Sequence, residues 1–473
     1  MSRTRPLILE SNEKAISASE GVWHPQYRRL TLGLVLLTLG PAFEALAVAT
    51  ILPKIVANLG GLSFYGWSFS AYMLATIVSL ILAGDEADRR GPARPFIIGV
   101  SLFVTGLLLA GTASSMLTFV LSRGVQGLGA GSIASVAYVC LGRGYSERVK
   151  PRMIAILASA WVVPGLVGPS LAGIIAIFAG WRWVFLGLIP VLPLATILVL
   201  PSLQKLNYAA TSASWNLPRL FAAVGLVIGS GMTLAGLQLP SLPLAILVAI
   251  VGLIVGIPSL HRILPAGTLR AKAGLPAAIA TMGLLSLGFF GADAFLPLTL
   301  ITIRGQSTLF AGAALTASTL AWTAGSWLQA RLAPRQGRRL LVTVGLLLII
   351  LGIAGIGCVL LPSVPVALAI VSWGVGGLGM GLSYSTVSLV VLETAPTDQQ
   401  GAATASMELA SVLGSALGTG LGGVIIAIVA SAGDLPSTGI ALVDVLVVVV
   451  IGVGIVTAVR LPGRPRQAAA LTK

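Results

Sequence analysis

Four carboxylates lie inside long apolar runs of this 473-residue chain. An ionisable side chain in such a run is costly in a membrane, so each is a candidate for proton or ligand binding and needs a partner or a water-filled cavity. The two nearest the ends of their runs, Glu408 and Asp444, have an ordinary alternative as solvated carboxylates at the membrane interface. The four residues are Glu44, Asp293, Glu408 and Asp444.

Glu44 has the sequence context that most favours a functional carboxylate. It lies between Pro41 and Pro53 in the run GPAFEALAVATILP, so we expect its helix to bend nearby and its side chain to face a cavity. Asp293, in FFGADAFLP, opens the second part of the chain in a similar way and is the expected counterpart of Glu44. For both residues, a carboxylate with a purely structural role is the alternative.

Arg123 is the one cation placed well within an apolar run, in LSRGVQGLGAGS at 121–132. Gln126 follows one helical turn later, so both polar groups share a helix face. A buried guanidinium needs a carboxylate or carbonyl oxygens around it. We therefore expect Arg123 to lie beside Glu44 and to tune its proton binding, with Asp293 as a secondary acid; a structural arginine is the alternative.

The segments that carry these residues must be membrane helices. The chain is 56% hydrophobic and 9% charged, far from the composition of soluble domains. Its net charge of +15 lies in short clusters between apolar runs, which indicates membrane topology and not nucleic-acid binding. The two cysteines and two histidines give no metal-ligand spacing, and without a P-loop we expect no cofactor and an ion gradient or downhill flow as the energy source.

Fourteen runs are long enough to cross the hydrocarbon core as helices. The turn LPSLP at 239–243 separates two of them, and a single re-entrant hairpin is the alternative for that pair. The predicted spans are 31–53, 67–84, 96–113, 116–140, 153–178, 183–201, 219–238, 241–260, 275–302, 309–331, 339–361, 365–392, 402–430 and 438–459.

The basic residues fix the expected orientation of these spans. With the N-terminus inside, all but four of the 29 lysines and arginines fall in cytoplasmic segments, as basic residues do in membrane proteins. Both termini are therefore expected in the cytoplasm, with the first thirty residues as a retained tail and not a signal peptide. The four exceptions are Lys54, Arg123, Arg182 and Arg304.

The spacing of the spans predicts two similar halves, a plan that transporters share. The expected organisation is a cytoplasmic tail (1–30), a six-helix half (31–201), a linker with two additional helices outside the gated core (202–274), a second six-helix half (275–460) and a cytoplasmic tail (461–473).

Four segments resemble motifs of the major facilitator superfamily. RGVQGLGAG at 123–131 is similar to the fourth-helix motif, and GDEADRRGPAR at 84–94 to the loop between the second and third helices. WVVPGLVGPSLAG at 161–173 resembles the fifth-helix motif of the antiporter branches. Glu44, nine residues before Pro53, resembles the first-helix motif of the fourteen-helix drug/proton antiporters, which usually has aspartate. The four matches cover most of the first six spans.

The resemblance implies roles for matching residues only. Glu86 stands where the family usually has an apolar residue, and Pro92 and Ala93 replace two positions that are often basic. The second half lacks the equivalent loop acid, so gating is expected to rely on the first half. The implied gating loop contains Gly84, Asp88, Arg89 and Gly91, and the implied antiporter motif contains Gly165, Gly168, Pro169 and Gly173.

The expected protein is an all-α integral membrane transporter with the major facilitator fold: two six-helix halves plus two extra central helices. The resemblance implies a monomer in the plasma (inner) membrane that exports small lipophilic or amphiphilic compounds in exchange for protons. Export of a lipid or a specific metabolite is one alternative; a membrane enzyme or a non-transporting receptor is another, against which stand the missing catalytic motifs and sensing domain. The expected cavity residues are Glu44, Arg123, Gln126, Asp293 and Glu408.

Overall fold

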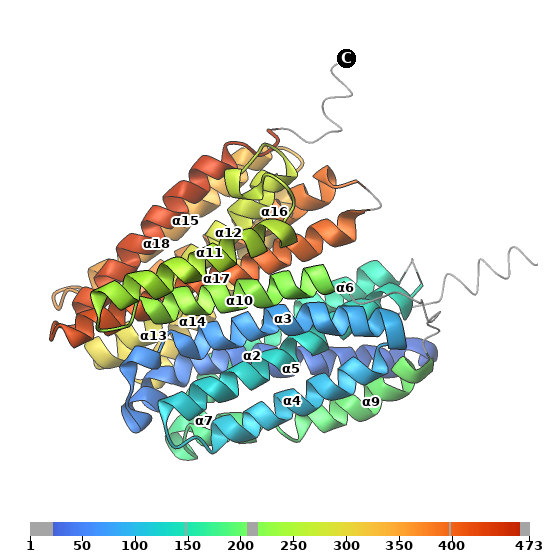
Figure 1. The fold of residues 1–473 in the computed structure, drawn as a ribbon, viewed down its shortest axis with the longest axis horizontal. Helices are drawn as coiled ribbons and strands as arrows, with labels where there is room; N and C mark the ends of the chain where they lie inside the picture. The colour runs from blue at the N-terminus through green and yellow to red at the C-terminus, as the bar shows by residue number, and fades with distance from the viewer. Residues whose placement is uncertain (1–21, 147–148, 206–215, 397–398, 464–473) are drawn as a thin grey trace, which may run out of the picture.

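The computed structural model describes residues 22–146, 149–205, 216–396 and 399–463, and every regular element in these ranges is helical (Figure 1). The long and short α-helices are α2 (Pro25–Leu59), α3 (Trp67–Arg90), α4 (Ala93–Gly111), α5 (Met116–Arg143), α6 (Lys150–Ala160), α7 (Val162–Phe178), α8 (Arg182–Leu186), α9 (Val191–Lys205), α10 (Leu217–Gly236), α11 (Leu242–Ile263), α12 (Leu275–Asp293), α13 (Leu296–Leu298), α14 (Thr308–Leu332), α15 (Arg338–Val359), α16 (Leu368–Thr394), α17 (Gln400–Ser431) and α18 (Pro436–Ala458). Three single-turn elements complete the set: η1 (Leu62–Phe64), η2 (Thr268–Arg270) and the π-helix η3 (Thr299–Ile303).

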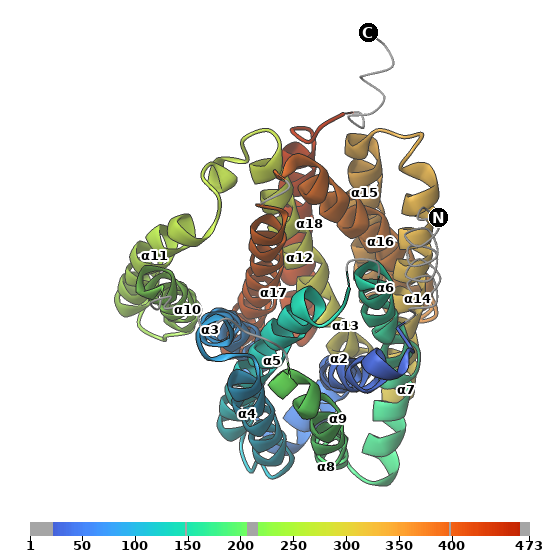
Figure 2. The ribbon, with the colours of Figure 1, turned by 90° about the vertical axis from the view of Figure 1, so that its right-hand side faces the viewer.

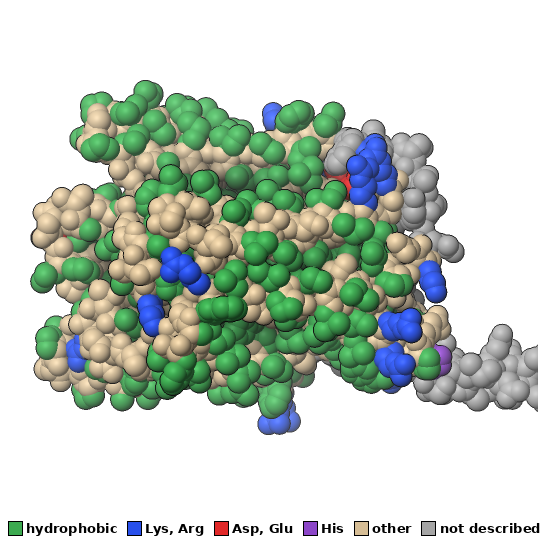
Figure 3. Space-filling view, turned by 90° about the horizontal axis from the view of Figure 1, so that it is seen from below, with side chains coloured by type: hydrophobic (Ala, Val, Ile, Leu, Met, Phe, Trp, Pro, Cys, Tyr) green, Lys and Arg blue, Asp and Glu red, His purple; other side chains and the backbone are tan. Residues whose placement is uncertain are grey.

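The helices confirm the predicted membrane spans. Twelve helical stretches of the described chain are long and apolar enough to cross a membrane. The remaining two predicted spans are occupied by the α6–α7 pair and by α14, whose polar serines and threonines lower its hydropathy. Figure 3 shows the broad apolar surface that such a bundle presents to lipid, with few charged side chains on it.

Proline divides two of the predicted spans. The span at 153–178 breaks between α6 and α7, where Pro164 has no N–H to donate to the Ala160 carbonyl one turn earlier. The span at 275–302 breaks after α12 because Pro297 stands in the same relation to Asp293, and the chain continues through α13 and η3. The helix carrying Asp293 therefore ends at that residue.

The spans form two groups, with α10 and α11 outside both (Figure 2). Helices α2 to α9 form the first group and α12 to α18 the second; α7 packs on α14, and α3 on α17, where the groups meet. The α10–α11 pair packs together through Gly229 and Gly252, and α10 contacts both α3 and α17. These two helices are central in the sequence, but in space they cover the seam between the groups.

Contacts between the groups are concentrated at the end where α2 finishes, which we call the outer end. There the Tyr65 hydroxyl donates to the Ala294 carbonyl (3.0 Å) and the Ser70 hydroxyl donates to the Ala416 carbonyl (2.8 Å). At the opposite, inner end, α15 and α18 rise away from α2 (Figure 1). The structure is therefore closed at its outer end.

The four cations outside the predicted cytoplasmic segments are all bound by protein atoms. The Lys54 ammonium donates to the Ala176 carbonyl, and Arg182 donates to the Ala113 carbonyl (3.1 Å). The Arg304 guanidinium donates to the carbonyls of residues 359, 361, 362 and 364, at the end of α15 and in the loop before α16. Arg123 is buried inside the first group. These four side chains have structural partners, which accounts for their departure from the charge pattern.

Candidate functional site

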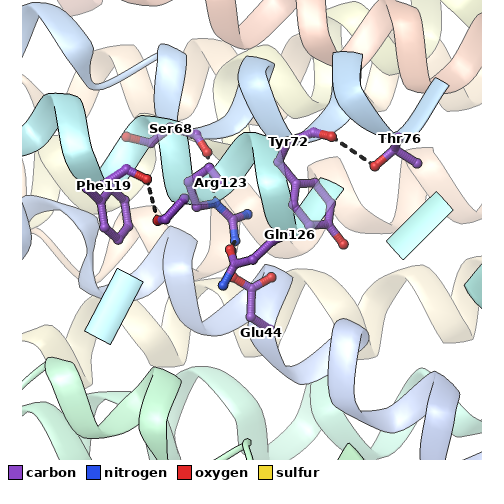
Figure 4. A network of polar contacts seen from close by, with 8 residues as sticks. Glu44, Ser68, Tyr72, Thr76, Phe119, Arg123 and Gln126 are labelled. Atoms are coloured by element: carbon purple, nitrogen blue, oxygen red, sulfur yellow. Dashed lines mark hydrogen bonds and ion pairs between the residues drawn. The ribbon is translucent and has the colours of Figure 1, made fainter. Parts of the chain in front are cut away.

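Helices α2, α3 and α5 bring Glu44, Arg123 and Gln126 together inside the first group (Figure 4). The Arg123 guanidinium donates to Glu44 Oε1 and to Gln126 Oε1, and its Nε donates to the Ser68 carbonyl (3.0 Å). It also lies 4.4 Å from the centre of the Tyr72 ring. The side chains of Arg123 and Glu44 are 2% and 0% exposed, so the ion pair is shielded from solvent.

Glycine lets the three helices approach closely enough to form this site. A side chain at Gly127 would meet the Tyr72 carbonyl at 2.1 Å, so α5 and α3 touch backbone to backbone beside the pair. Gly106 of α4 leaves space for Gln126 in the same way, because a Cβ added at Gly106 would lie 2.4 Å from Gln126 Cγ. The spacing of Arg123 and Gln126 on one helix face then directs both polar groups to Glu44.

The site retains unused hydrogen-bonding capacity. Glu44 Oε2 and Gln126 Nε2 are buried and have no hydrogen-bond partner in the structure. A buried polar atom without a partner is uncommon and usually has a functional or structural explanation. One oxygen of Glu44 is thus available to carry a proton while the other faces Arg123.

Glu44 does not face a cavity in this structure, contrary to expectation. Helix α2 continues without interruption through Pro41 and Pro53, and the carboxylate is fully buried against Arg123. The two prolines leave the helix unbroken, and the site is closed because α3 and α5 pack directly over it. The Glu44 carboxylate is therefore closed to solvent in this arrangement of the helices.

The other intramembrane acids lie apart from this pair. Asp293 and Glu408 belong to the second group, where Asp293 accepts from Trp373 Nε1 (2.7 Å) and Glu408 accepts from the Tyr384 hydroxyl (3.3 Å). The expected cavity set is thus divided between the two groups. Asp444 of α18 is half-buried and lies beside Gly357 near the end of α15, and its Oδ2 has no hydrogen-bond partner among the described residues.

The loop resembling a gating motif lies at the inner end of α3. Gly91 ends the helix with a φ of 87°, a conformation that favours glycine, and Gly84 faces Ser135 of α5. Asp88 and Arg89 both interact with other residues. Glu86, the departure from the family pattern, pairs with Arg90 (3.2 Å) and Arg94 (3.3 Å), so the substituted acid has its own basic partners.

The motif in α7 lies where the two groups meet. The space beside Gly165 is filled by the Thr319 side chain of α14, and Gly312 of α14 packs against the backbone of Pro169. A Cβ added at Gly173 would lie 3.5 Å from Leu309 N, so α7 is close to the backbone of α14 at its outer end. Gly168 of the motif instead faces α2, where an added Cβ would lie 3.5 Å from the Phe43 ring. The α7 motif thus joins the helix that carries Glu44 to the second group.

An ion pair in the second group was not expected from the sequence. Arg338, at the start of α15, donates to both oxygens of Glu393 near the end of α16 (3.3 and 2.7 Å). The loop between α14 and α15 itself contains no acid, and Glu393 lies far from it in the sequence. The signal was present, since the two residues lie at the inner ends of two predicted spans.

Comparisons with known proteins agree with this architecture. The model of the Major Facilitator Superfamily matches residues 32–419. The multidrug transporter protein MdtP of Bacillus subtilis is 25% identical over 404 residues, which cover 82% of this chain and 73% of that protein. The multidrug resistance protein B homolog of Mycobacterium tuberculosis is 26% identical, covering 83% and 75%. The crystal structure of an auto-inhibited POT family peptide transporter superposes with a TM-score of 0.68 over 93% of this chain and 98% of that one; at 15% identity this likeness concerns the fold alone.

Proposed function

Because the chain belongs to the major facilitator superfamily, we propose that it is a secondary active transporter that exports lipophilic or amphiphilic compounds in exchange for protons. The relatives named as multidrug transporters support the substrate class. The observation that carries the proton step is the buried Glu44–Arg123 pair, in which one carboxylate oxygen has no partner.

Protonation of Glu44 would change the forces that hold three helices together. The charged pair attracts α2 to α5, whereas a protonated Glu44 loses this attraction and Arg123 keeps its bonds to Ser68 and Gln126. Removing the charge of one partner in a buried ion pair typically costs about 3–5 kcal/mol. An energy of this size is enough to change which of two conformations is the more populated. A proton bound in one conformation and released in the other drives the cycle.

The packing of α2 offers a route from this pair to the second group. Phe43, next to Glu44, contacts Gly168 of α7, and α7 contacts Thr319 of α14 through Gly165. A shift of α2 relative to α5 therefore changes the α7–α14 junction. In the proposed cycle, the outer ends of α3 and α17 separate while the inner ends of the two helix groups approach each other. The space between the groups then opens to each side of the membrane in turn.

The proposed setting follows from the charge pattern. Most cations lie in segments at the inner end, where α2 begins and α18 finishes, so we place both termini in the cytoplasm and the protein in the plasma (inner) membrane. We propose that transport then runs from the cytoplasm outward. We also propose that the protein works as a monomer surrounded by lipid.

The test is transport by the purified protein in proteoliposomes with a panel of cationic and neutral dyes. We expect an imposed proton gradient to concentrate several dyes and a protonophore to abolish this accumulation. A sodium gradient of equal size serves as the control. Dye movement that only equilibrates, or that follows sodium, would refute proton antiport.

A further inference from the structure

The loop that joins α11 to α12, residues 264–274, presents cations at the inner end of the molecule. Arg270 and Lys272 lie within this loop, and both side chains are exposed. Arg262 precedes the loop in the last turn of α11, and Arg460 follows α18; both are also exposed. Cations from α11, from the loop and from the end of α18 therefore lie on the inner surface of the same part of the protein.

Hydrogen bonds hold three of these cations next to one another. The backbone N–H groups of Arg270 and Lys272 both donate to the Gly267 carbonyl (3.2 and 3.1 Å), so the two residues share one turn. The Arg460 guanidinium donates to the carbonyls of Arg270 (2.6 Å) and Ala271 (3.1 Å). We call Arg270, Lys272 and Arg460 the linker cluster. Its three like charges repel one another, and the loop keeps them together.

The loop holds these residues in a defined backbone conformation. Gly267 and Gly274 have φ angles of 91° and 93°, which glycine adopts freely. Ala271 has a φ of 44° and is the only non-glycine residue with a positive φ in the described part of the chain. Such a conformation persists where the surroundings enforce it, and the bonds from Arg460 do so here. The linker cluster is thus presented by a constrained loop.

The linker cluster has no acidic partner within the protein. The sequence contains no aspartate or glutamate between Glu147 and Asp293, and none after Asp444. Among the described residues, no carboxylate forms an ion pair with the linker cluster or with Arg262. Several cations elsewhere at the inner end do have such partners: Arg90 and Arg94 pair with Glu86, and Arg338 pairs with Glu393.

Apolar side chains accompany the linker cluster. Leu269, next to Arg270, is 47% exposed, so the loop presents an apolar side chain beside its cations. The helix contacts of α11 are made almost entirely with α10, and Figure 2 shows α11 standing apart from α12 with the loop crossing between them. The outer face of α11 is therefore free to contact lipid chains, through residues such as Ile250, Ile254 and Ile257.

We propose that the linker cluster binds the headgroup of an anionic phospholipid in the inner leaflet, with Leu269 and the exposed face of α11 against its acyl chains. The phosphate supplies the negative charge that the described residues do not, and arginine forms strong charge-assisted hydrogen bonds to phosphate. Basic pockets between membrane helices on the cytoplasmic side suit acidic headgroups. This proposal goes beyond transport and does not depend on how transport is driven.

The general excess of cations at inner ends does not account for this arrangement. That excess places basic residues in cytoplasmic loops but does not require them to be clustered or free of acids. The linker cluster joins the loop after α11 to the end of α18 through Arg460. A lipid bound there would contact both elements and stabilise the position of the α10–α11 pair beside the second group.

The test is native mass spectrometry of the full-length protein in detergent micelles, titrated with phosphatidylglycerol or with phosphatidylcholine of the same acyl chains. Wild type should bind one phosphatidylglycerol at least tenfold more tightly than phosphatidylcholine. Arg270→Gln/Lys272→Gln should weaken this binding by about 30-fold, which corresponds to about 2 kcal/mol, because two cations are lost. Phosphatidylcholine binding should change by less than about twofold.

Two further variants serve as controls. Arg331→Gln/Arg335→Gln removes two exposed cations at the inner end of α14 and should bind phosphatidylglycerol as wild type does. Arg270→Lys/Lys272→Arg keeps both charges in the linker cluster and should also bind as wild type does. A thermal melt of each variant checks that it is folded.

Equal affinity of wild type for the two lipids would overturn the proposal without any variant. Wild-type phosphatidylglycerol affinity in Arg270→Gln/Lys272→Gln would do the same. An equal loss in Arg331→Gln/Arg335→Gln would show a general attraction to the basic surface in place of a site. Displacement of the lipid by an equal concentration of glycerol phosphate, which lacks acyl chains, would show a site for free anions and contradict lipid binding.

Discussion

The outer ends of α3 and α17 touch backbone to backbone, and this contact can be broken with one methyl group. A Cβ added at Gly66 would lie 2.4 Å from the Thr419 carbonyl oxygen and 2.8 Å from Gly423 Cα. Both obstacles are backbone atoms, so no side-chain rotation relieves the overlap. Gly66 has a φ of −63°, which alanine adopts freely, so the effect of Gly66→Ala comes from the contact alone.

The size of the effect follows from this overlap. Ordinary contacts of a Cβ begin at about 3.4 Å, so α3 must move about 1 Å from α17, and overpacking of this kind costs roughly 1–3 kcal/mol. The energy penalises only the outer-closed state. Gly66→Ala should therefore shift the conformational equilibrium toward the outward-open state by about 5- to 150-fold.

The shift can be read from a cysteine placed inside the closed junction. Ser70 is fully buried and bonded to α17, so an impermeant thiol reagent should label Ser70→Cys only when the outer end opens. Gly66→Ala in this background should raise the labelling rate by the same factor. Gly124→Ala is the matched control, because nothing lies within 4 Å of its added Cβ. Equal labelling of the two variants, both folded, would refute the outer contact as a gate.

Three further predictions test other parts of the structure. Ser241→Cys, in the turn between α10 and α11, should be labelled by an impermeant reagent from outside the cell; labelling only from the cytoplasm would exclude two full spans. Asp88→Asn should slow transport at least tenfold with folding and substrate binding retained, whereas equal loss of binding would indicate a folding role. Arg304→Met removes hydrogen bonds to four carbonyls and should lower the unfolding midpoint in a thermal melt by several degrees. An unchanged midpoint would show that these hydrogen bonds do not stabilise the protein.

Much of the fold could be predicted because a membrane leaves few choices for the backbone. The length and polarity of each run defined the spans, and the pair around 239–243 was correctly expected as two helices. The position of that pair could not be predicted, because run length carries no information on lateral packing. The α10–α11 pair proved to cover the α3–α17 seam through contacts such as Leu234 against Gly420.

The ion pair of the site could be predicted because a buried arginine requires an acidic partner. A buried Arg123 needs an acid, and the structure places Glu44 beside it. The closed surroundings of Glu44 could not be predicted, since they depend on how α3 and α5 pack over α2. The contacts among the rings of the second group were missed because these residues come from three helices and form no linear motif. They are Phe289, Trp322, Trp373 and Tyr384.

Uphill transport by Glu44→Gln tests the central claim most directly. Glutamine keeps the size of the side chain and fixes it as neutral, so proton binding is removed while the contacts of Arg123 with Ser68 and Gln126 remain available. Purified Glu44→Gln in proteoliposomes should still exchange substrate down its own gradient, which shows that it is folded. It should not concentrate any substrate under an imposed proton gradient, and substrate should move no protons. If Glu44→Gln instead concentrates substrate with the wild-type dependence on pH, Glu44 is structural and the coupling acid must be sought at Asp293 or Glu408.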